Sequence, residues 1–279
     1  MKWTIAFDSG CDLRNFQSPP TAELELVPLK ILLGGREVVD DGSTSLLQLQ
    51  AMLDSKTGKT GTACPSVGDW HAAMEGRDNV IAITISGAVS GSYQAACAAR
   101  DMILEEEPDR NIFVMNSRSG SGTMQMLLDK ALELIDAGAD FHQVCRSLEE
   151  FRECSQIFFL LKNVDNVMSN GRLNPIIGRA VKALKMCLLA TVTKEGSMDV
   201  IAKVCSFGKT MDKAVAQCVS RGCSPKKAII THCLNEEGAE QLKEKFITQF
   251  PGVEVEICQT GLLCGYYAEK GGLILAVQS

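Results

Sequence analysis

Residues 80–92 read VIAITISGAVSGS, and a helix-like run follows them as far as residue 107. The first six residues are apolar or β-branched, which is typical of a buried parallel strand. Ser90, Gly91 and Ser92 end the turn that follows. A glycine-rich turn that opens a helix leaves backbone N–H groups unpaired, and the helix dipole adds positive charge there. We therefore expect an anion-binding site at this turn; the alternative is an ordinary turn with Ser92 as the helix N-cap.

Short apolar strands and helices alternate on both sides of this turn. The sequence predicts strands at 3–7, 24–33 and 111–115, a loop at 58–66, and helices at 45–54, 67–75, 93–107, 123–137 and 141–154. Two more Ser/Gly-rich turns, 9–10 and 117–122, also follow predicted strands. Ligands of open parallel sheets bind beyond the carboxyl ends of the strands. The first half is therefore predicted to be an α/β unit, with a mainly parallel, Rossmann-like sheet and its binding site at these turns.

The pattern changes near residue 155, where we place the boundary between two domains, 1–155 and 156–279. Beyond it, strands are predicted at 157–161, 188–192, 200–204, 227–231, 253–258 and 273–277, with helices at 164–168, 211–220 and 237–249. This order favours an α+β domain with a mixed or antiparallel sheet.

Composition narrows the classes of function. The chain has 279 residues, 46% of them hydrophobic, and a formal net charge of −6. This negative charge argues against nucleic acid and anionic membrane surfaces as partners. Residues 80–99 carry no charge, but their Ser, Gly, Thr, Tyr and Gln residues argue against an integral membrane segment.

The cysteines point to a cytoplasmic protein. There are 12 of them, no two spaced as Cys-x-x-Cys, and no secretory signal opens the sequence. Reduced thiols fit this pattern better than a disulfide framework does. With 3 histidines, none at ligand spacing from a cysteine pair, no metal site is predicted.

Five motifs occur in order over almost the whole chain. They are FDSGCDL at 7–13, VPL at 27–29, TACPS at 62–66, ISGAVSGSYQAA at 85–96 and NGR at 170–172. In this order they resemble the motifs of the DegV family of bacterial fatty-acid-binding proteins, and the Ser-Gly-Ser-Tyr-Gln segment is the most specific of them. The resemblance implies a DegV-type fold of two domains, with a long acyl tunnel between them.

The family resemblance also implies a function and a set of site residues. It implies a lipid carrier that needs no cofactor, has no catalytic residues of its own and presents a long-chain fatty acid to a partner fatty acid kinase. A histidine usual in the family is replaced here by Tyr267, whose hydroxyl can donate a hydrogen bond but cannot supply an imidazolium. The residues expected to hold the carboxylate are Thr62, Ser90, Gly91, Ser92, Arg172 and Tyr267.

Two other classes of function stay open at this point. A serine esterase-like hydrolase would use Ser90 as nucleophile with His232 as the least implausible base, although residues 88–92 lack the Gly-x-Ser-x-Gly elbow. A phosphate or nucleotide binder of the usual kind would have a Gly-x-x-x-x-Gly-Lys loop or a well-formed Gly-x-Gly-x-x-Gly loop, and neither is present. The sequence does not indicate an oligomeric state.

Overall fold

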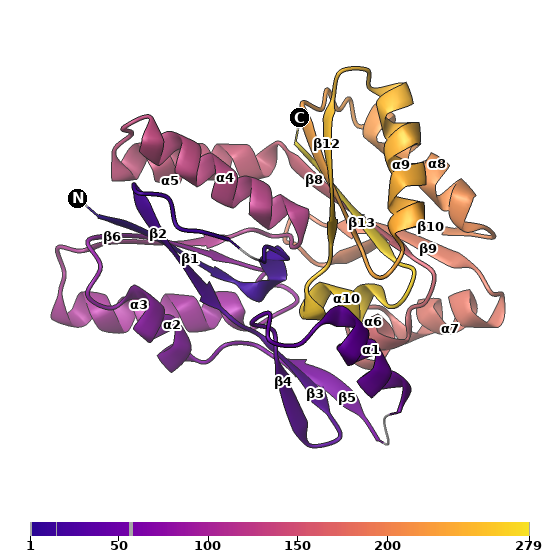
Figure 1. Cartoon of the computed structure of the whole chain (residues 1–279), viewed down its shortest axis with the longest axis horizontal. Coiled ribbons are helices and arrows are strands. Elements are labelled where there is room, and N and C mark those ends of the chain that lie inside the picture. The colour runs from indigo at the N-terminus through magenta and orange to yellow at the C-terminus, as the bar shows by residue number, and fades with distance from the viewer. Residues whose placement is uncertain (1, 15, 56–57, 279) are drawn as a thin grey trace.

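A computed structural model describes residues 2–14, 16–55 and 58–278. Its first sheet is parallel throughout, with strand order β2-β1-β6-β7. The strands are β1 (Trp3–Asp8), β2 (Ala22–Val27), β6 (Asn79–Thr84) and β7 (Asn111–Asn116). Helices α2 (Val67–Met74) and α3 (Ser92–Glu106) cover one face, and α4 (Gly122–Asp136) and α5 (Phe141–Glu153) cover the other (Figure 1).

The two faces follow from the alternation of side chains along each strand. Ile5 and Phe7 of β1 pack into the cluster formed by α4 and α5, whereas Ala6 between them packs against α2 and α3. All three residues are fully buried. A strand covered on both faces needs no polar side, which is why the central strands β1 and β6 are mainly apolar, whereas the edge strand β2 carries Glu23 and Glu25.

The second half of the chain forms a six-stranded mixed sheet. Its order is β10-β9-β8-β13-β11-β12, and of these pairs β11 and β12 run parallel while the others are antiparallel. The strands are β8 (Ser155–Leu161), β9 (Cys187–Val192), β10 (Met198–Val204), β11 (Lys227–His232), β12 (Glu254–Gln259) and β13 (Leu273–Gln278). Helices α8 (Phe207–Ser220) and α9 (Glu236–Gln249) cover its outer face (Figure 1). The predicted fold class, a parallel α/β unit followed by an α+β unit, is confirmed.

A small antiparallel sheet lies against the inner side of this second half. It consists of β3 (Lys30–Leu33), β4 (Arg36–Val39) and β5 (Thr60–Ala63). The neighbouring helices are α1 (Leu46–Asp54), α6 (Asp165–Ser169), α7 (Pro175–Ala183) and α10 (Leu262–Ala268). Residues from both halves of the chain, such as Ile31, Leu49 and Leu188, share one buried cluster here.

Two predictions about elements in this region were wrong. The single extended run expected at 24–33 is two strands, β2 and β3, which belong to different sheets. Pro28 stands between them and has no N–H with which to continue a ladder. The loop expected at 58–66 contains β5, whose small half-buried residues give no alternating signal.

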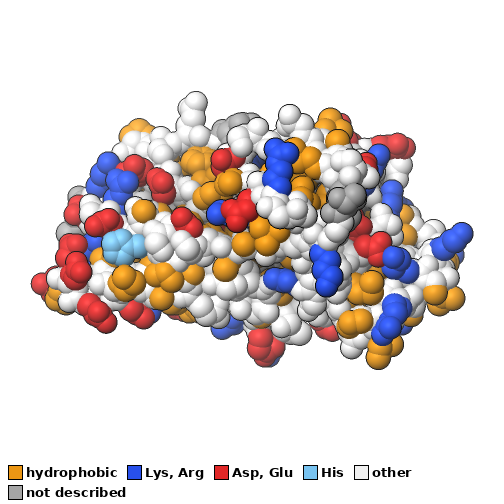
Figure 2. Space-filling view, turned by 90° about the horizontal axis from the view of Figure 1, so that it is seen from below, with side chains coloured by type: hydrophobic (Ala, Val, Ile, Leu, Met, Phe, Trp, Pro, Cys, Tyr) orange, Lys and Arg blue, Asp and Glu red, His pale blue; other side chains and the backbone are white. Residues whose placement is uncertain are grey.

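Charges of both signs are mixed on the face shown in Figure 2. Acidic side chains are denser towards the end that carries α2 and α3, and basic ones towards the end that carries α7. This face therefore presents no field of a single sign.

Buried carboxylates connect the two halves of the chain. Asp12 accepts the backbone N–H of Gly261 at 2.7 Å and the hydroxyl of Ser121 at 2.7 Å. Asp40 accepts the first backbone N–H groups of α10, those of Leu262 and Leu263, each at 3.0 Å. These bonds fix the start of α10 against the first half of the chain, since the first N–H groups of a helix have no partner within it.

Asp12 should make the stability of the fold depend on pH. Burial raises the pKa of its carboxyl to about 6, although the charge of Arg14 acts in the opposite direction. The folded protein therefore holds this proton at pH values where the unfolded chain has released it. The resulting stabilisation is fully present below about pH 4 and is lost as the pH rises through about 6. In urea titrations, the stability of the wild type relative to Asp12→Asn should fall across this window, by at most about 1.4 kcal/mol per pH unit.

Asp41 provides a control for this measurement, because its pKa is shifted in the opposite direction to that of Asp12. Its carboxylate accepts bonds from Ser43, and these lower its pKa. The stability of the wild type relative to Asp41→Asn should thus be lost as the pH falls below the ordinary range for aspartate. A difference between wild type and Asp12→Asn that stays flat across pH 4 to 6 would contradict the raised pKa of Asp12.

Candidate functional site

A cavity of about 830 Å³, including its part open to solvent, lies where the turns of the parallel sheet face the second half of the chain. Most of its wall is apolar and comes from both halves. The apolar lining includes Leu29, Ile85, Val89, Phe159, Leu161, Met198, Leu263 and Ile274. A cavity with this lining suits a ligand that is mainly hydrocarbon.

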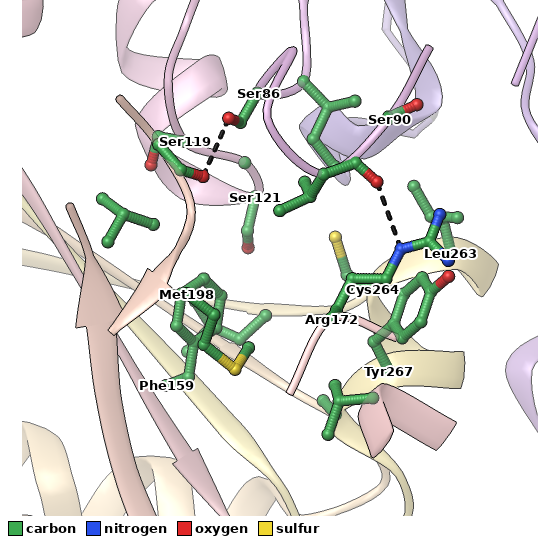
Figure 3. A pocket seen from close by; sticks show the side chains of 18 of the residues that line it. Ser86, Ser90, Ser119, Ser121, Phe159, Arg172, Met198, Leu263, Cys264 and Tyr267 are labelled. Atoms are coloured by element: carbon green, nitrogen blue, oxygen red, sulfur yellow. Dashed lines mark hydrogen bonds between the residues drawn. The ribbon is translucent and has the colours of Figure 1, made fainter. Parts of the chain in front are cut away.

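The polar groups of this cavity form two sets (Figure 3). Ser86, Ser119 and Ser121 lie together where the turns after β6 and β7 meet it. Arg172 and Tyr267 lie on another side, near the backbone of Val89. The turns after β1, β6 and β7 are neighbours because these strands are neighbours in the sheet, which is the arrangement expected from the three Ser/Gly-rich turns.

Tyr267 and Thr62 are joined by a hydrogen bond across the cavity wall. The two hydroxyl oxygens are 2.8 Å apart, although one belongs to α10 and the other to β5. Burial raises the pKa of the Tyr267 phenol, while Thr62 and Arg172 lower it less. The phenol is therefore neutral near pH 7 and can act as a hydrogen-bond donor.

Arg172 ties the loop after α6 to the turn that carries Ser90. Its Nε donates to the carbonyl oxygen of Val89 at 3.1 Å (Figure 3), and its Nη1 donates to the carbonyl oxygen of Asn170. The guanidinium carbon is 5.7 Å from the centre of the Tyr267 ring, within cation–π range. A guanidinium has five N–H donors, so these bonds leave donors that an anion in the cavity can use.

The Ser90–Ser92 turn differs in part from its prediction. Ser90 lines the cavity, and its hydroxyl accepts the N–H of Ser92 at 3.3 Å. Ser92 is fully buried outside the cavity lining and donates its hydroxyl to Asp8 at 2.6 Å, so its expected place beside a ligand is wrong. It is not the N-cap of α3 either: that position is Gly91, which makes no side-chain cap bond.

Gly91 also lies outside the residues that line the cavity. A Cβ at this position would be 3.1 Å from the Sγ of Cys64, in the loop after β5. Gly91 therefore allows the two loops of the first half to approach closely.

The structure thus brings Thr62, Ser90, Arg172 and Tyr267 to one cavity from four separate parts of the chain. Ser86, Ser119 and Ser121 also line this cavity, although they were not among the predicted site residues. They could have been predicted from the sequence, because all three lie in the Ser/Gly-rich turns that were expected at the carboxyl ends of the strands.

The geometry does not favour an esterase. His232 is 8% exposed, and its Nδ1 accepts the backbone N–H of Asn235 at 3.2 Å. Among the described residues, it is not part of the cavity lining that includes Ser90. The imidazole is therefore not placed to activate Ser90 as a nucleophile.

Across 2–14, 16–55 and 58–278, no helix combines the length and the apolar character needed to cross a bilayer. No cluster of three or more His, Cys, Asp or Glu side chains in this part of the chain could hold a metal ion.

A family model, described as an uncharacterised protein of the DegV family, matches residues 2–278. The chain belongs to the DegV family. A DegV domain-containing protein of Streptococcus pneumoniae is 32% identical over 279 residues, which cover 100% of this chain and 99% of the relative. The family resemblance seen in the sequence is therefore confirmed.

Solved structures of DegV proteins match this chain closely. The Fatty Acid Kinase B3 protein of Streptococcus pneumoniae, loaded with linoleic acid, has a TM-score of 0.95 and 32% identity, over 100% of this chain and 99% of that one. A DegV protein of Eubacterium eligens loaded with heptadecanoic acid has a TM-score of 0.92 and 28% identity, over 99% of each chain. A DegV protein of Ruminococcus gnavus, refined with vaccenic acid, has a TM-score of 0.90 and 26% identity, again over 99% of each chain.

Proposed function

We propose that this DegV protein binds a long-chain fatty acid and encloses its acyl tail in the cavity between the two halves of the chain. The observation that carries the proposal is the apolar cavity lined by both halves of the chain, with hydroxyl and guanidinium donors at one side. Three similar DegV structures hold linoleic, heptadecanoic or vaccenic acid, which supports the same ligand class here.

The acyl tail supplies most of the binding free energy in this proposal. At ~0.8 kcal/mol per buried methylene, a tail of about fifteen carbons gives roughly 12 kcal/mol of gross transfer energy. The loss of ligand freedom removes a large part of it. The remainder still permits tight binding, because each 1.4 kcal/mol or so is tenfold in affinity.

The carboxylate fixes the orientation of the ligand. A carboxylate buried without partners would take up a proton instead of staying charged. We assign its partners as Thr62, Ser90, Arg172 and Tyr267, because they line one cavity and all can donate. We also propose that the backbone N–H of Gly91, next to Ser90, donates to the carboxylate. We do not include Ser92, because its hydroxyl donates to Asp8.

The protein would act as a carrier rather than as an enzyme, and a partner kinase would phosphorylate the acid. The similar Streptococcus pneumoniae protein is named as part of a fatty acid kinase, which supports such a partner. We also propose a cytoplasmic location, because all 12 cysteines of the chain are free thiols.

Native mass spectrometry of protein purified from bacteria tests the binding proposal. The expected spectrum contains a fraction of chains carrying one long-chain fatty acid, and added palmitate or oleate should fill the rest. Acetate, which has the head group without the tail, should not bind measurably. A chain that is purified empty and also refuses palmitate and oleate would overturn the proposal.

Tyr267 provides a test of the head-group assignment. Tyr267→Phe keeps the ring beside Arg172 but removes the hydroxyl 2.8 Å from Thr62. Loss of one such hydrogen bond should weaken oleate binding by about 2- to 10-fold in a fluorescent fatty-acid displacement assay. Tyr93→Phe, on α3 outside the cavity lining, is the matched control and should bind as the wild type does. Equal affinities of the Tyr267 and Tyr93 variants would remove Tyr267 from the head-group site.

The same position tests the kinase-coupled role. Tyr267→His introduces the imidazole that is usual in the family. If the missing imidazole limits phosphoryl transfer, this variant should form more acyl phosphate with a fatty acid kinase than the wild type does. The rate is normalised to the fraction of protein loaded with acid. An unchanged rate would show that the tyrosine is not the limiting feature.

A further inference from the structure

A second pocket adjoins the lipid cavity but has a different lining. Its volume is about 680 Å³, including its part open to solvent, and it shares Ser119 and Val192 with the lipid cavity. Its other walls come from the turn after β7, the end of α5, the start of β8, the β9–β10 turn and the residue after α8. It is a polar site at the junction of the two halves of the chain.

Cationic side chains from four separate parts of the chain line this polar pocket. They are Arg118, Arg152, Lys194 and Arg221. Among the described lining residues, Glu153 is the acidic one. The chain as a whole has a net charge of −6, so the positive charge of this pocket is a local feature and does not follow from the overall composition.

Internal ion pairs account for only part of this charge. The Oε1 of Glu153 accepts from the Nη1 of Arg118 at 3.1 Å and from the Nη2 of Arg152 at 2.7 Å, so one carboxylate serves two guanidinium groups. Arg221 reaches the side-chain amide oxygen of Gln156 at 3.4 Å rather than a carboxylate. Lys194 is exposed, next to Glu195, which lies outside the pocket lining.

Two buried hydroxyl groups in the same wall lack partners. Ser119 is 7% exposed and Thr123 is 2% exposed. The Oγ of Ser119 and the Oγ1 of Thr123 make no hydrogen bond to any described residue. Buried hydroxyl groups usually have hydrogen-bond partners. Two such groups without partners, beside a polar pocket, therefore indicate that a ligand enters this pocket.

We propose that this polar pocket binds a phosphate monoester. A tetrahedral dianion offers three terminal oxygens, enough to engage several guanidinium groups at once, whereas a carboxylate offers two. Arginine also matches the geometry of phosphate oxygens through paired N–H bonds. The proposal does not depend on fatty-acid binding, because the head-group residues Thr62, Arg172 and Tyr267 do not line this pocket.

Calorimetry with inorganic phosphate as the probe, at constant ionic strength, gives the first test. Wild-type protein should bind phosphate in the millimolar range or tighter. The double variant Arg118→Gln/Arg221→Gln should bind at least about tenfold more weakly, because charged hydrogen bonds are lost. Lys213→Gln, at an exposed lysine of α8 outside the pocket, is the matched control and should bind as the wild type does.

A second variant separates binding from folding. Ser119→Ala removes a buried hydroxyl that has no partner, so thermal unfolding should occur at the same temperature or higher. Phosphate binding should nevertheless weaken. Phosphate binding that is unaffected by Ser119→Ala and by the arginine substitutions would overturn the proposal, as would an absence of binding to the wild type.

Two further probes distinguish the sources of the phosphate. Glycerol 3-phosphate represents a free ester, and vesicles of phosphatidylcholine containing phosphatidic acid represent a lipid head group. Binding of either probe that is lost in Arg118→Gln/Arg221→Gln supports the proposal and names the source. Oleate binding measured in parallel should survive in this variant. A wild type that binds oleate but neither phosphate probe would overturn this proposal alone, and one that binds phosphate but not oleate would overturn the fatty-acid proposal alone.

Discussion

Asp40→Ala should lower the free energy of unfolding by about 3–5 kcal/mol. Asp40 is fully buried and forms an ion pair with Arg14, in which the Nη2 and Oδ1 atoms are 2.6 Å apart. Its two oxygens also accept the first N–H groups of α10, from Leu262 and Leu263. The alanine leaves a largely buried guanidinium without its carboxylate and two helix N–H groups without acceptors. Urea denaturation followed by circular dichroism measures the loss.

Neighbouring substitutions make this result specific. Asp41→Ala changes an exposed carboxylate one residue away and should cost no more than about 1 kcal/mol. The double variant Arg14→Met/Asp40→Ala should recover part of the loss, because the unpaired charge is gone. A cost for Asp40→Ala close to that of Asp41→Ala would show that the buried pair does not hold α10. Because α10 carries Tyr267, fatty-acid binding should weaken together with stability.

Arg172→Ala should weaken the binding of oleate by about 10- to 100-fold, but should weaken the binding of oleyl alcohol much less. The expected loss corresponds to about 1.5–3 kcal/mol for hydrogen bonds to a charged group. The alcohol has the same tail and lacks the carboxylate, so the difference between the two ligands isolates the charge of the head group. Displacement of a fluorescent fatty acid measures both affinities.

Two control variants separate the effect of the Arg172 charge on the ligand from the effect of its hydrogen bond to Val89 on the structure. Arg172→Lys keeps the positive charge but not the planar fork, and it should lie between the wild type and the alanine variant for oleate. Arg179→Ala changes an arginine on α7 whose side chain donates to its own helix, and should leave both ligands unaffected. Equal losses for acid and alcohol in Arg172→Ala would mean that Arg172 only shapes the cavity.

The strongly patterned elements were predictable from the sequence. The strand at 80–85 corresponds to β6, and the helices predicted at 93–107 and 123–137 correspond to α3 and α4 within one residue or so. The missed elements are short or contain residues that disrupt a pattern. Helix α7 begins with Pro175 and has Gly178 in its middle, and α10 has seven residues. Their stability comes from packing against the rest of the fold rather than from local preference.

The residues that line the candidate site were predictable only in part, and their geometry was not: Gly91 and Ser92 lie outside the cavity lining. The family resemblance selected Thr62, Ser90, Arg172 and Tyr267, and the structure places all four on one cavity. Nothing in the sequence distinguishes the hydroxyl of Ser90 from that of Ser92 two positions later. The first turn of α3 directs Ser92 inwards to Asp8, a residue 84 positions away. Long-range partners of this kind decide which serine is available to a ligand.

The order of the strands in the second sheet has a consequence for biosynthesis. Strand β13 lies between β8 and β11, yet it leaves the ribosome after both of them. Until it is inserted, β8-β9-β10 and β11-β12 are separate ribbons, and α10 has just been made. A nascent chain therefore cannot complete the apolar cavity before translation has passed β13. The first, parallel sheet can form earlier, as N-terminal units do. A ligand enclosed by both halves of the chain, as proposed above, can therefore be enclosed only after β13 has been made.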